Sequence, residues 1–355
     1  MTRFNLAIAI LACSVSTSSF AAPPDVHYRV TRINADPPPN RLIEPAELND
    51  KGVLAAFSND TPRQSFLWDG ELVDLSASLD GPTQSVTATG INNHRDVTLI
   101  AVDTQGVQRA YVLRRGRDPI LVEVLAGAPV VVNDINNRRQ VVGNTIDADG
   151  HPRLFIWKRG EATLLSPPPF LGRTFASEIN DHGDVVGDNI TGSDEFESSQ
   201  ALLWKAGEIT EIVPAATEEG EPIDSTANAI NDRGQVVGSL FPLFGGPGDA
   251  GAYVWQDGQR TMLPSLFGGT AGSAQDINNS GDIVGQSSSS SENRATLWRK
   301  GVAIDLTQQI DSTDPLHGVV SLISALKINN RGQILAFGNE SSEGALRLYL
   351  LDPVH

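Results

Sequence analysis

The stretch INDRGQVVG at residues 230–238 decides the fold, because close copies of it recur along the chain. Ile or Leu, then Asn, then Asn or Asp occur together seven times, and successive copies start 43, 44, 44, 51, 47 and 51 residues apart. Spacings of this size are typical of four-stranded β-propeller blades. The seven copies are Leu48-Asn49-Asp50, Ile91-Asn92-Asn93, Ile135-Asn136-Asn137, Ile179-Asn180-Asp181, Ile230-Asn231-Asp232, Ile277-Asn278-Asn279 and Ile328-Asn329-Asn330.

The chemistry of this motif predicts a tight turn between two strands. Asx side chains hydrogen-bond nearby backbone and so begin turns, while Gly supplies a positive φ without a Cβ clash. Gly follows two positions after the second Asx residue in five copies, and Arg95 and Arg139 replace it in the other two. If those two copies keep the turn, each Arg should cost about 1 kcal/mol.

A second motif places a tryptophan at the same point of five copies, after the turn and its following strand. Leu113 and Leu351 stand at this point in the other two copies. A Gly and a last short apolar segment follow, so each unit is expected to contain four strands, a to d. The tryptophans are Trp68, Trp157, Trp204, Trp255 and Trp298, which are all the tryptophans of the chain.

The two ends of the chain complement each other. The seventh copy stops after its third strand, whereas residues 26–33 form a strand-like segment without a unit of its own. Pairing them gives an all-β fold, a seven-bladed β-propeller of four-stranded antiparallel blades, closed by the N-terminal strand on the C-terminal blade. We expect residues 22–355 to form this single domain. A β-solenoid is the alternative fold.

Residues 1–21 are typical of a secretory signal peptide. Arg3 precedes an apolar stretch over residues 4–15, and Ser19-Phe20-Ala21 forms a cleavage site of small residues. The protein is therefore expected to be exported, either periplasmic or secreted. A lipoprotein anchored through Cys13, the only cysteine, is the alternative. No later segment approaches the length of a transmembrane helix, so we expect no transmembrane segment.

Composition narrows the function classes further. The chain has 33 Gly, 21 Pro and a formal net charge of -17. This acidic balance disfavours nucleic acid as a partner, because nucleic-acid binding requires clustered Lys and Arg. We expect a monomer. The sequence contains no nucleophile elbow, zinc-binding helix motif or phosphate-binding loop, so an enzyme is less expected than a binding protein.

The pairing of INNxGxVVG-like turns with a downstream AFLWxxG-like segment resembles the HAF repeats of predicted extracellular bacterial proteins, over about residues 41 to 352. The His that gives those repeats their name is absent from every copy. The resemblance implies export and a repeat architecture, and it implies no enzymatic activity.

The variable loops of one face are the candidate binding surface. In a four-stranded meander, the a–b and c–d turns share one face, and the b–c loops share the other with the connections between blades. Turns on the first face are short, whereas loops on the second vary, and variable loops on a rigid scaffold often bind ligands. Acidic residues gather in loops of the fourth blade and of the connection to the fifth: Asp194, Glu195, Glu197, Glu218, Glu219, Glu221 and Asp224.

This acidic surface could bind a cationic partner, a protein or carbohydrate ligand, or an ion such as Ca²⁺. The simpler interpretation is a solvated surface that keeps the protein soluble. The alternative functions are an extracellular carbohydrate-active enzyme, a lyase or glycosidase, on the same face, and a structural cell-surface module. Asp147-Ala148-Asp149-Gly150 begins like a calcium loop, but no Glu occupies the twelfth position, so a plain hairpin loop is expected there.

Overall fold

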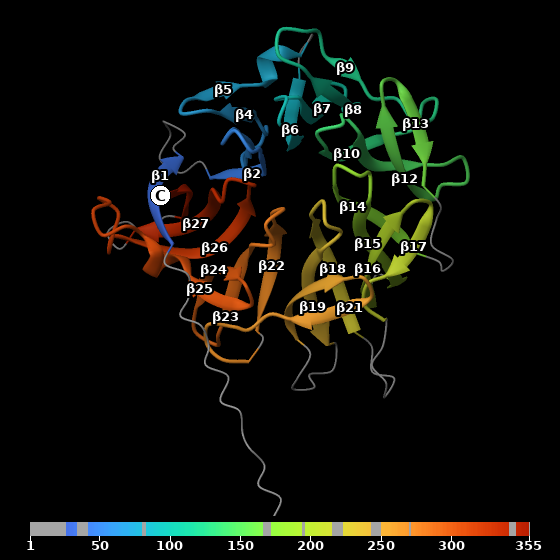
Figure 1. Ribbon diagram of the computed structural model, residues 1–355. Helices are drawn as coiled ribbons and strands as arrows, with labels where there is room; N and C mark the ends of the chain where they lie inside the picture. The colour runs from blue at the N-terminus through green and yellow to red at the C-terminus, as the bar shows by residue number, and fades with distance from the viewer. Residues whose placement is uncertain are drawn as a thin grey trace, which may run out of the picture.

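Seven four-stranded antiparallel sheets surround a central axis, as Figure 1 shows. The computed structural model describes residues 26–33, 42–79, 83–165, 172–193, 196–214, 223–242, 250–269, 271–340 and 346–354. Each sheet is one blade of a β-propeller, and the predicted seven-bladed fold is confirmed. No helix within these ranges is long and apolar enough to span a bilayer.

Six blades each use four consecutive strands, a to d, from the axis outward. Blades 1 to 3 are built from β2 (Ile43–Leu48), β3 (Leu54–Ser58), β4 (Ser65–Trp68), β5 (Leu72–Asp74), β6 (Thr83–Ile91), β7 (Val97–Asp103), β8 (Gln108–Leu113), β9 (Ile120–Leu121), β10 (Val130–Ile135), β11 (Val141–Ile146), β12 (Pro152–Lys158) and β13 (Glu161–Leu164). Blades 4 to 6 are built from β14 (Arg173–Ile179), β15 (Val185–Ser193), β16 (Phe196–Lys205), β17 (Glu208–Glu211), β18 (Ile223–Ile230), β19 (Val236–Pro242), β20 (Gly251–Gln256), β21 (Gln259–Met262), β22 (Gly272–Ile277), β23 (Ile283–Ser288), β24 (Asn293–Arg299) and β25 (Val302–Asp305).

Blade 7 combines both ends of the chain. Its first three strands are β26 (Val320–Ile328), β27 (Ile334–Glu340) and β28 (Leu346–Val354), and β1 (His27–Ile33) pairs with β28 as the fourth. In Figure 1 the blue β1 lies against the red strands of this blade. Two short 3-10 helices, η1 (Ser76–Ser78) and η2 (Leu306–Gln309), follow β5 and β25. The predicted closure of the ring is therefore confirmed.

The Asn turns join the blades to one another as well as connecting strands a and b. In Asn49, Oδ1 accepts hydrogen bonds from the backbone N–H groups of Lys51 and Val53, which closes the turn. Its Nδ2 donates to the backbone carbonyl of Asn92 in the next blade, 3.0 Å away. The same inter-blade bond recurs from Asn92, Asn136, Asn180, Asn231, Asn278 and Asn329, at 2.8 to 3.2 Å, and returns to Asn49.

A second closed ring uses the next residue of each motif. The backbone N–H of Asp50 donates to Oδ1 of Asn93 in the following blade, at 2.8 Å. Equivalent bonds of 2.7 or 2.8 Å link every neighbouring pair of blades. The repeated Asx pair therefore satisfies buried backbone groups across all seven blade interfaces. Arg95 and Arg139 keep their turns with positive φ values of 62° and 59°, as the sequence requires of a turn without Gly.

Each innermost strand has an irregularity at the same place. A register shift interrupts the pairing of strand a with strand b in every blade, for example between Ala176 and Glu178. Such bulges re-aim the neighbouring side chains. The residue just after the shift immediately precedes the Ile or Leu of the turn motif, and in four blades it lines a cavity on the axis.

Candidate functional site

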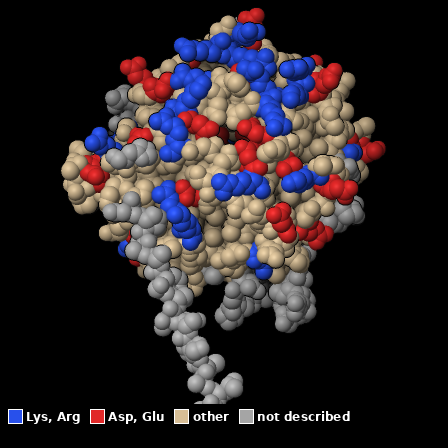
Figure 2. All heavy atoms as spheres, viewed as in Figure 1, with Lys and Arg blue, Asp and Glu red and all other residues tan. Residues whose placement is uncertain are grey.

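A cavity of about 130 Å³, here called the channel, lies on the axis where the Asn turns meet, and it is open to solvent. The side chains of Glu47, Asp134, Glu178 and Asp276 line it together with the turns. Figure 2 shows the central hollow of this face with Asp and Glu side chains around it. Four carboxylates therefore line one small cavity, and among them Asp134 and Asp276 are buried while Glu47 and Glu178 are half-buried.

Two of these carboxylates are held by backbone donors from two blades. Asp134 accepts hydrogen bonds from the N–H groups of Ile135, at 2.6 Å, and of Ile179 in the next blade, at 3.1 Å. Asp276 does the same with Ile277 and with Ile328, at 2.7 and 2.8 Å. Burial outweighs these bonds and raises the pKa of both carboxyl groups to about 6.

One ammonium group faces the four carboxylates. Nζ of Lys327 lies 2.6 Å from Oε2 of Glu47. Burial lowers the pKa of Lys327, but Glu47, Asp276 and Glu178 outweigh burial and raise it well above its usual value. Oε2 of Glu178 is buried and has no hydrogen-bond partner among the described residues. Burial and the neighbouring Asp276 raise the pKa of Glu178 well above its usual range.

The channel carboxylates do not converge on one point. Within the described ranges, only Asp147, Asp149 and His151 place three potential ligand atoms within 4.8 Å of one another. That cluster is the hairpin loop of blade 3, where Asp147 accepts backbone hydrogen bonds from Asp149 and His151. Its carboxylate therefore also helps to shape the turn. The channel cluster can hold protons and structural charge, and its geometry is not that of a chelate.

A second cavity, of about 820 Å³, lies between blades 1 and 2. We call it the blade 1–2 groove. Its volume lies within the range of ligand pockets, roughly 300–1,000 Å³. Six aliphatic side chains line it, and no aromatic ring from the described residues does. The aliphatic residues are Val53, Leu67, Val73, Leu75, Val97 and Leu113.

The groove is found where the repeated tryptophan is missing. In five blade interfaces a tryptophan of strand c packs against the preceding blade. Trp298 also donates its Nε1 hydrogen to the carbonyl of Pro264, at 2.7 Å. Leu113 occupies this position between blades 1 and 2, and its shorter side chain leaves space unfilled. Leu351 occupies it between blades 6 and 7, where Tyr28 packs in the same cluster.

An unusual turn adds positive charge to the groove. Four blades connect strands c and d through two residues, for example Arg159 and Gly160, whereas β8 and β9 are joined by residues 114–119. Arg114, Arg115 and Arg117 of this longer turn line the groove, as does Arg95 of the neighbouring a–b turn. Figure 2 shows Lys and Arg gathered over this upper part of the face, where Figure 1 places β4, β5, β8 and β9.

These arginines differ in their partners. Arg95 forms an ion pair with Asp69. Nε of Arg114 is buried without a hydrogen-bond partner in the described part of the chain, and Oδ1 of Asp96 lies 4.0 Å from it. Arg115 and Arg117 are exposed, and within the same residues their guanidinium groups make no ion pair. The groove therefore presents unpaired cationic donors beside aliphatic side chains.

Most of the acidic loop residues chosen from the sequence fall outside the described residues. These are Asp194, Glu195, Glu218, Glu219 and Glu221. Glu197 of β16 pairs with Arg173, and Asp224 of β18 accepts a hydrogen bond of 2.7 Å from the hydroxyl of Ser198. The structure brings β16 and β18 of neighbouring blades together, so these two carboxylates lie in one region, and both are already engaged.

The sequence interpretation missed both cavities, although it contained a signal for each. The residues that precede the Ile or Leu of the seven motifs include four carboxylates and one lysine. Placed around one axis, they form the cluster in which a single ammonium group faces several carboxylates. The replacement of tryptophan by Leu113, next to an Arg-rich turn, marks the groove.

Comparisons with known proteins agree with the fold. A family model described as "Protein of unknown function (DUF3466)" matches residues 169–303, which is less than half of the chain. No curated protein matches the sequence. Among solved structures, the chain is similar to the β-propeller domain of the Trilobed protease from Pyrococcus furiosus, with a TM-score of 0.54 and 9% identity over 88% of this chain and 94% of that one.

Two further structures are similar at low identity. One is YCF48 bound to D1 peptide, with a TM-score of 0.50 and 7% identity over 93% of this chain and 99% of that one. Another is the Aleuria aurantia lectin in complex with a methyl fucoside, with a TM-score of 0.37 and 10% identity over 77% and 97%. At these identities the first two likenesses bear on the fold alone, and the sheet order shows that this chain is a seven-bladed β-propeller.

Proposed function

We propose that this protein is an exported, non-catalytic binding propeller and that the blade 1–2 groove is its ligand site. The proposal rests on one observation: a cavity of about 820 Å³ takes the place of the tryptophan that packs five of the other blade interfaces. Guanidinium groups stay charged and do not exchange protons near neutral pH, so they suit ligand binding better than acid–base catalysis. The signal-peptide pattern of residues 1–21 and the resemblance to HAF repeats support export.

Filling the groove should remove its binding capacity. Leu113→Trp introduces the side chain that the equivalent position carries in five other blades, so the variant should fold normally. We expect it to weaken binding of the fluorescent probe anilinonaphthalene sulfonate by about tenfold or more, because the indole occupies apolar surface that the probe would bury. Fluorescence titration of the purified protein measures this change.

Val107→Trp is the matched control, because Val107 is exposed and does not line the groove. This variant should bind the probe as the wild type does. Equal probe binding by the wild type and by Leu113→Trp would show that the groove is not the site.

The acidic loops are a second proposed surface, for a cationic partner. The observation in its favour is that Glu197 and Asp224 come from adjoining strands of blades 4 and 5. Replacing Glu218, Glu219 and Glu221 together by Gln should weaken binding of polylysine at low salt, because each change removes a negative charge. Titration at two salt concentrations tests this, and an unchanged affinity and salt dependence would reject the surface.

A further inference from the structure

We propose that the ligand of the blade 1–2 groove is an alkyl chain with an anionic head group. The chain would lie along the aliphatic side chains, and the head group would bind Arg115 and Arg117. This inference rests on the proposed function, because it names the ligand class of the same groove.

The aliphatic part of the groove favours an alkyl chain over ligands that are polar along their whole length. Apart from its charged residues, the described lining offers one polar side chain, Ser78. A buried peptide would bring backbone N–H and C=O groups that need hydrogen-bond partners, and unpaired polar groups are costly to bury. A sugar commonly stacks on an aromatic ring and needs several hydrogen bonds, and the described lining has no aromatic ring. An alkyl chain makes neither demand, and its burial is favourable.

The charges of the groove select an anionic head group. Arg95, Arg114, Arg115 and Arg117 line it, against Asp69 and Glu71 on the side of blade 1. Since Asp69 is paired with Arg95, the guanidinium groups of the c–d turn keep an excess of positive charge. The planar guanidinium fork matches carboxylate and phosphate oxygens and can bind them through two hydrogen bonds.

Arg115 and Arg117, not Arg114, present the donors for the head group. Nε of Arg114 is buried and lies 4.0 Å from Oδ1 of Asp96, so its contribution to the groove is mainly its charge. Arg115 and Arg117 of the same turn are exposed, so their guanidinium groups can reach an anionic head group.

The test compares probes that share one chain and differ in the head group. Decanoate, decyl phosphate and decanol are titrated into the wild-type protein near pH 8 by isothermal titration calorimetry. We expect the anionic probes to bind at least about tenfold more tightly than decanol, as charge-assisted hydrogen bonds predict. The stronger of the two anionic probes identifies the head group as a carboxylate or a phosphate.

Arg115→Gln/Arg117→Gln should remove this preference and leave decanol binding unchanged. Both residues are exposed, so the fold should not depend on their charges. Arg138→Gln/Arg331→Gln removes the same charge from exposed turn residues outside the groove, and it should retain the preference.

The possible failures are distinct. If all three probes bind equally and Leu113→Trp prevents their binding, the groove is a ligand site but the anionic head group is wrong. If Leu113→Trp leaves every titration unchanged, the proposed function itself is wrong. Loss of the preference in Arg138→Gln/Arg331→Gln would show that the general charge of this face, and not the groove, attracts the anion.

Discussion

Replacing Lys327 by Met should destabilise the protein by up to about 3 kcal/mol near pH 8, because removing one partner of a half-buried ion pair leaves the carboxylates around it uncompensated. In the wild type its ammonium lies 2.6 Å from Glu47 and also compensates Glu178 and Asp276. Met keeps much of the aliphatic volume, so the loss should come mainly from charge and not from a cavity.

The destabilisation should depend on pH in a defined direction. Asp134 and Asp276 have a pKa of about 6 in the folded protein, above the usual value of 3.8. A carboxyl group with a raised folded pKa contributes stability below its unfolded pKa, and that contribution is lost as pH rises through the folded pKa. Without Lys327 these pKa values should rise further. The variant should therefore lose far less stability near pH 5 than near pH 8.

Urea unfolding followed by tryptophan fluorescence measures both values, since the five tryptophans lie in blade interfaces. Glu178→Gln, added to Lys327→Met, should restore part of the loss near pH 8, because it removes a carboxylate whose Oε2 has no described partner. An equal loss at both pH values would contradict an electrostatic role and would point to packing alone.

The channel illustrates why the sequence predicted the blades and not this cluster. The turn motif predicts strand ends locally, because Asn49 closes its own turn through Lys51 and Val53. Its Nδ2 bond to the next blade exists only after the ring has formed. Likewise, Glu47 and Lys327 are 280 residues apart and meet because blade 7 lies beside blade 1. A sequence difference between two copies of the motif therefore does not reveal a site until the copies are placed around one axis.

The groove was not predicted from the sequence for a related reason. The absence of tryptophan at both Leu113 and Leu351 is visible in the sequence, yet the cavities at the two places differ. The cavity between blades 1 and 2 is about 820 Å³ and has an aliphatic lining, whereas the cavity between blades 6 and 7 is about 320 Å³ and is lined mainly by polar residues. The outcome depends on Tyr28, which reaches the interface of blades 6 and 7 from the other end of the chain. Among the residues that the structure describes, no counterpart fills the interface of blades 1 and 2. Sequence alone reveals the missing side chain, and the tertiary structure decides whether another residue replaces it.

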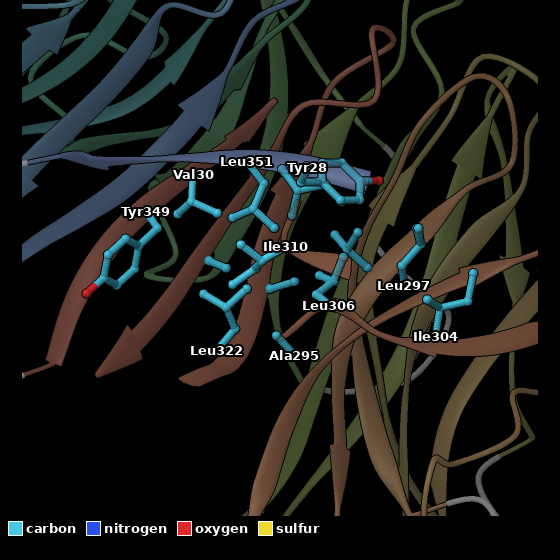
Figure 3. Packing of buried hydrophobic residues seen from close by; sticks show 14 of the residues in the cluster. Tyr28, Val30, Ala295, Leu297, Ile304, Leu306, Ile310, Leu322, Tyr349 and Leu351 are labelled. Carbon is cyan, nitrogen blue, oxygen red and sulfur yellow. The ribbon is translucent and has the colours of Figure 1, made fainter. Parts of the chain in front are cut away.

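Tyr28 is accordingly the residue whose loss should most weaken the closure of the ring. It is fully buried among Ile310, Leu306 and Leu351, as Figure 3 shows. Its backbone carbonyl also accepts a hydrogen bond of 2.9 Å from the N–H of Asp311. Tyr28→Ala should destabilise the protein by about 3–5 kcal/mol, as other large-to-small aromatic replacements in cores do.

The rest of β1 should keep the variant assembled under native conditions. Arg32 binds Glu340 through two hydrogen bonds of 2.6 Å, and Tyr349 donates a third of 2.9 Å to Glu340. Burial raises the pKa of Glu340, but these bonds outweigh burial and lower it, so the carboxylate stays charged. The closing strand is thus held by packing at one end and by an ion pair at the other.

Chemical denaturation of Tyr28→Ala beside Tyr28→Phe separates packing from polarity. Tyr28→Phe keeps the ring and should stay within about 1 kcal/mol of the wild type, because volume-conserving replacements are usually tolerated. Tyr28→Ala should in addition become more sensitive to proteolysis near its N-terminus, since β1 would detach from β28 more often. If Tyr28→Ala unfolds at the urea concentration of the wild type, the N-terminal strand does not hold the ring closed. The stability of the propeller must then come from the two rings of hydrogen bonds made by the Asn turns and from the other six blade interfaces.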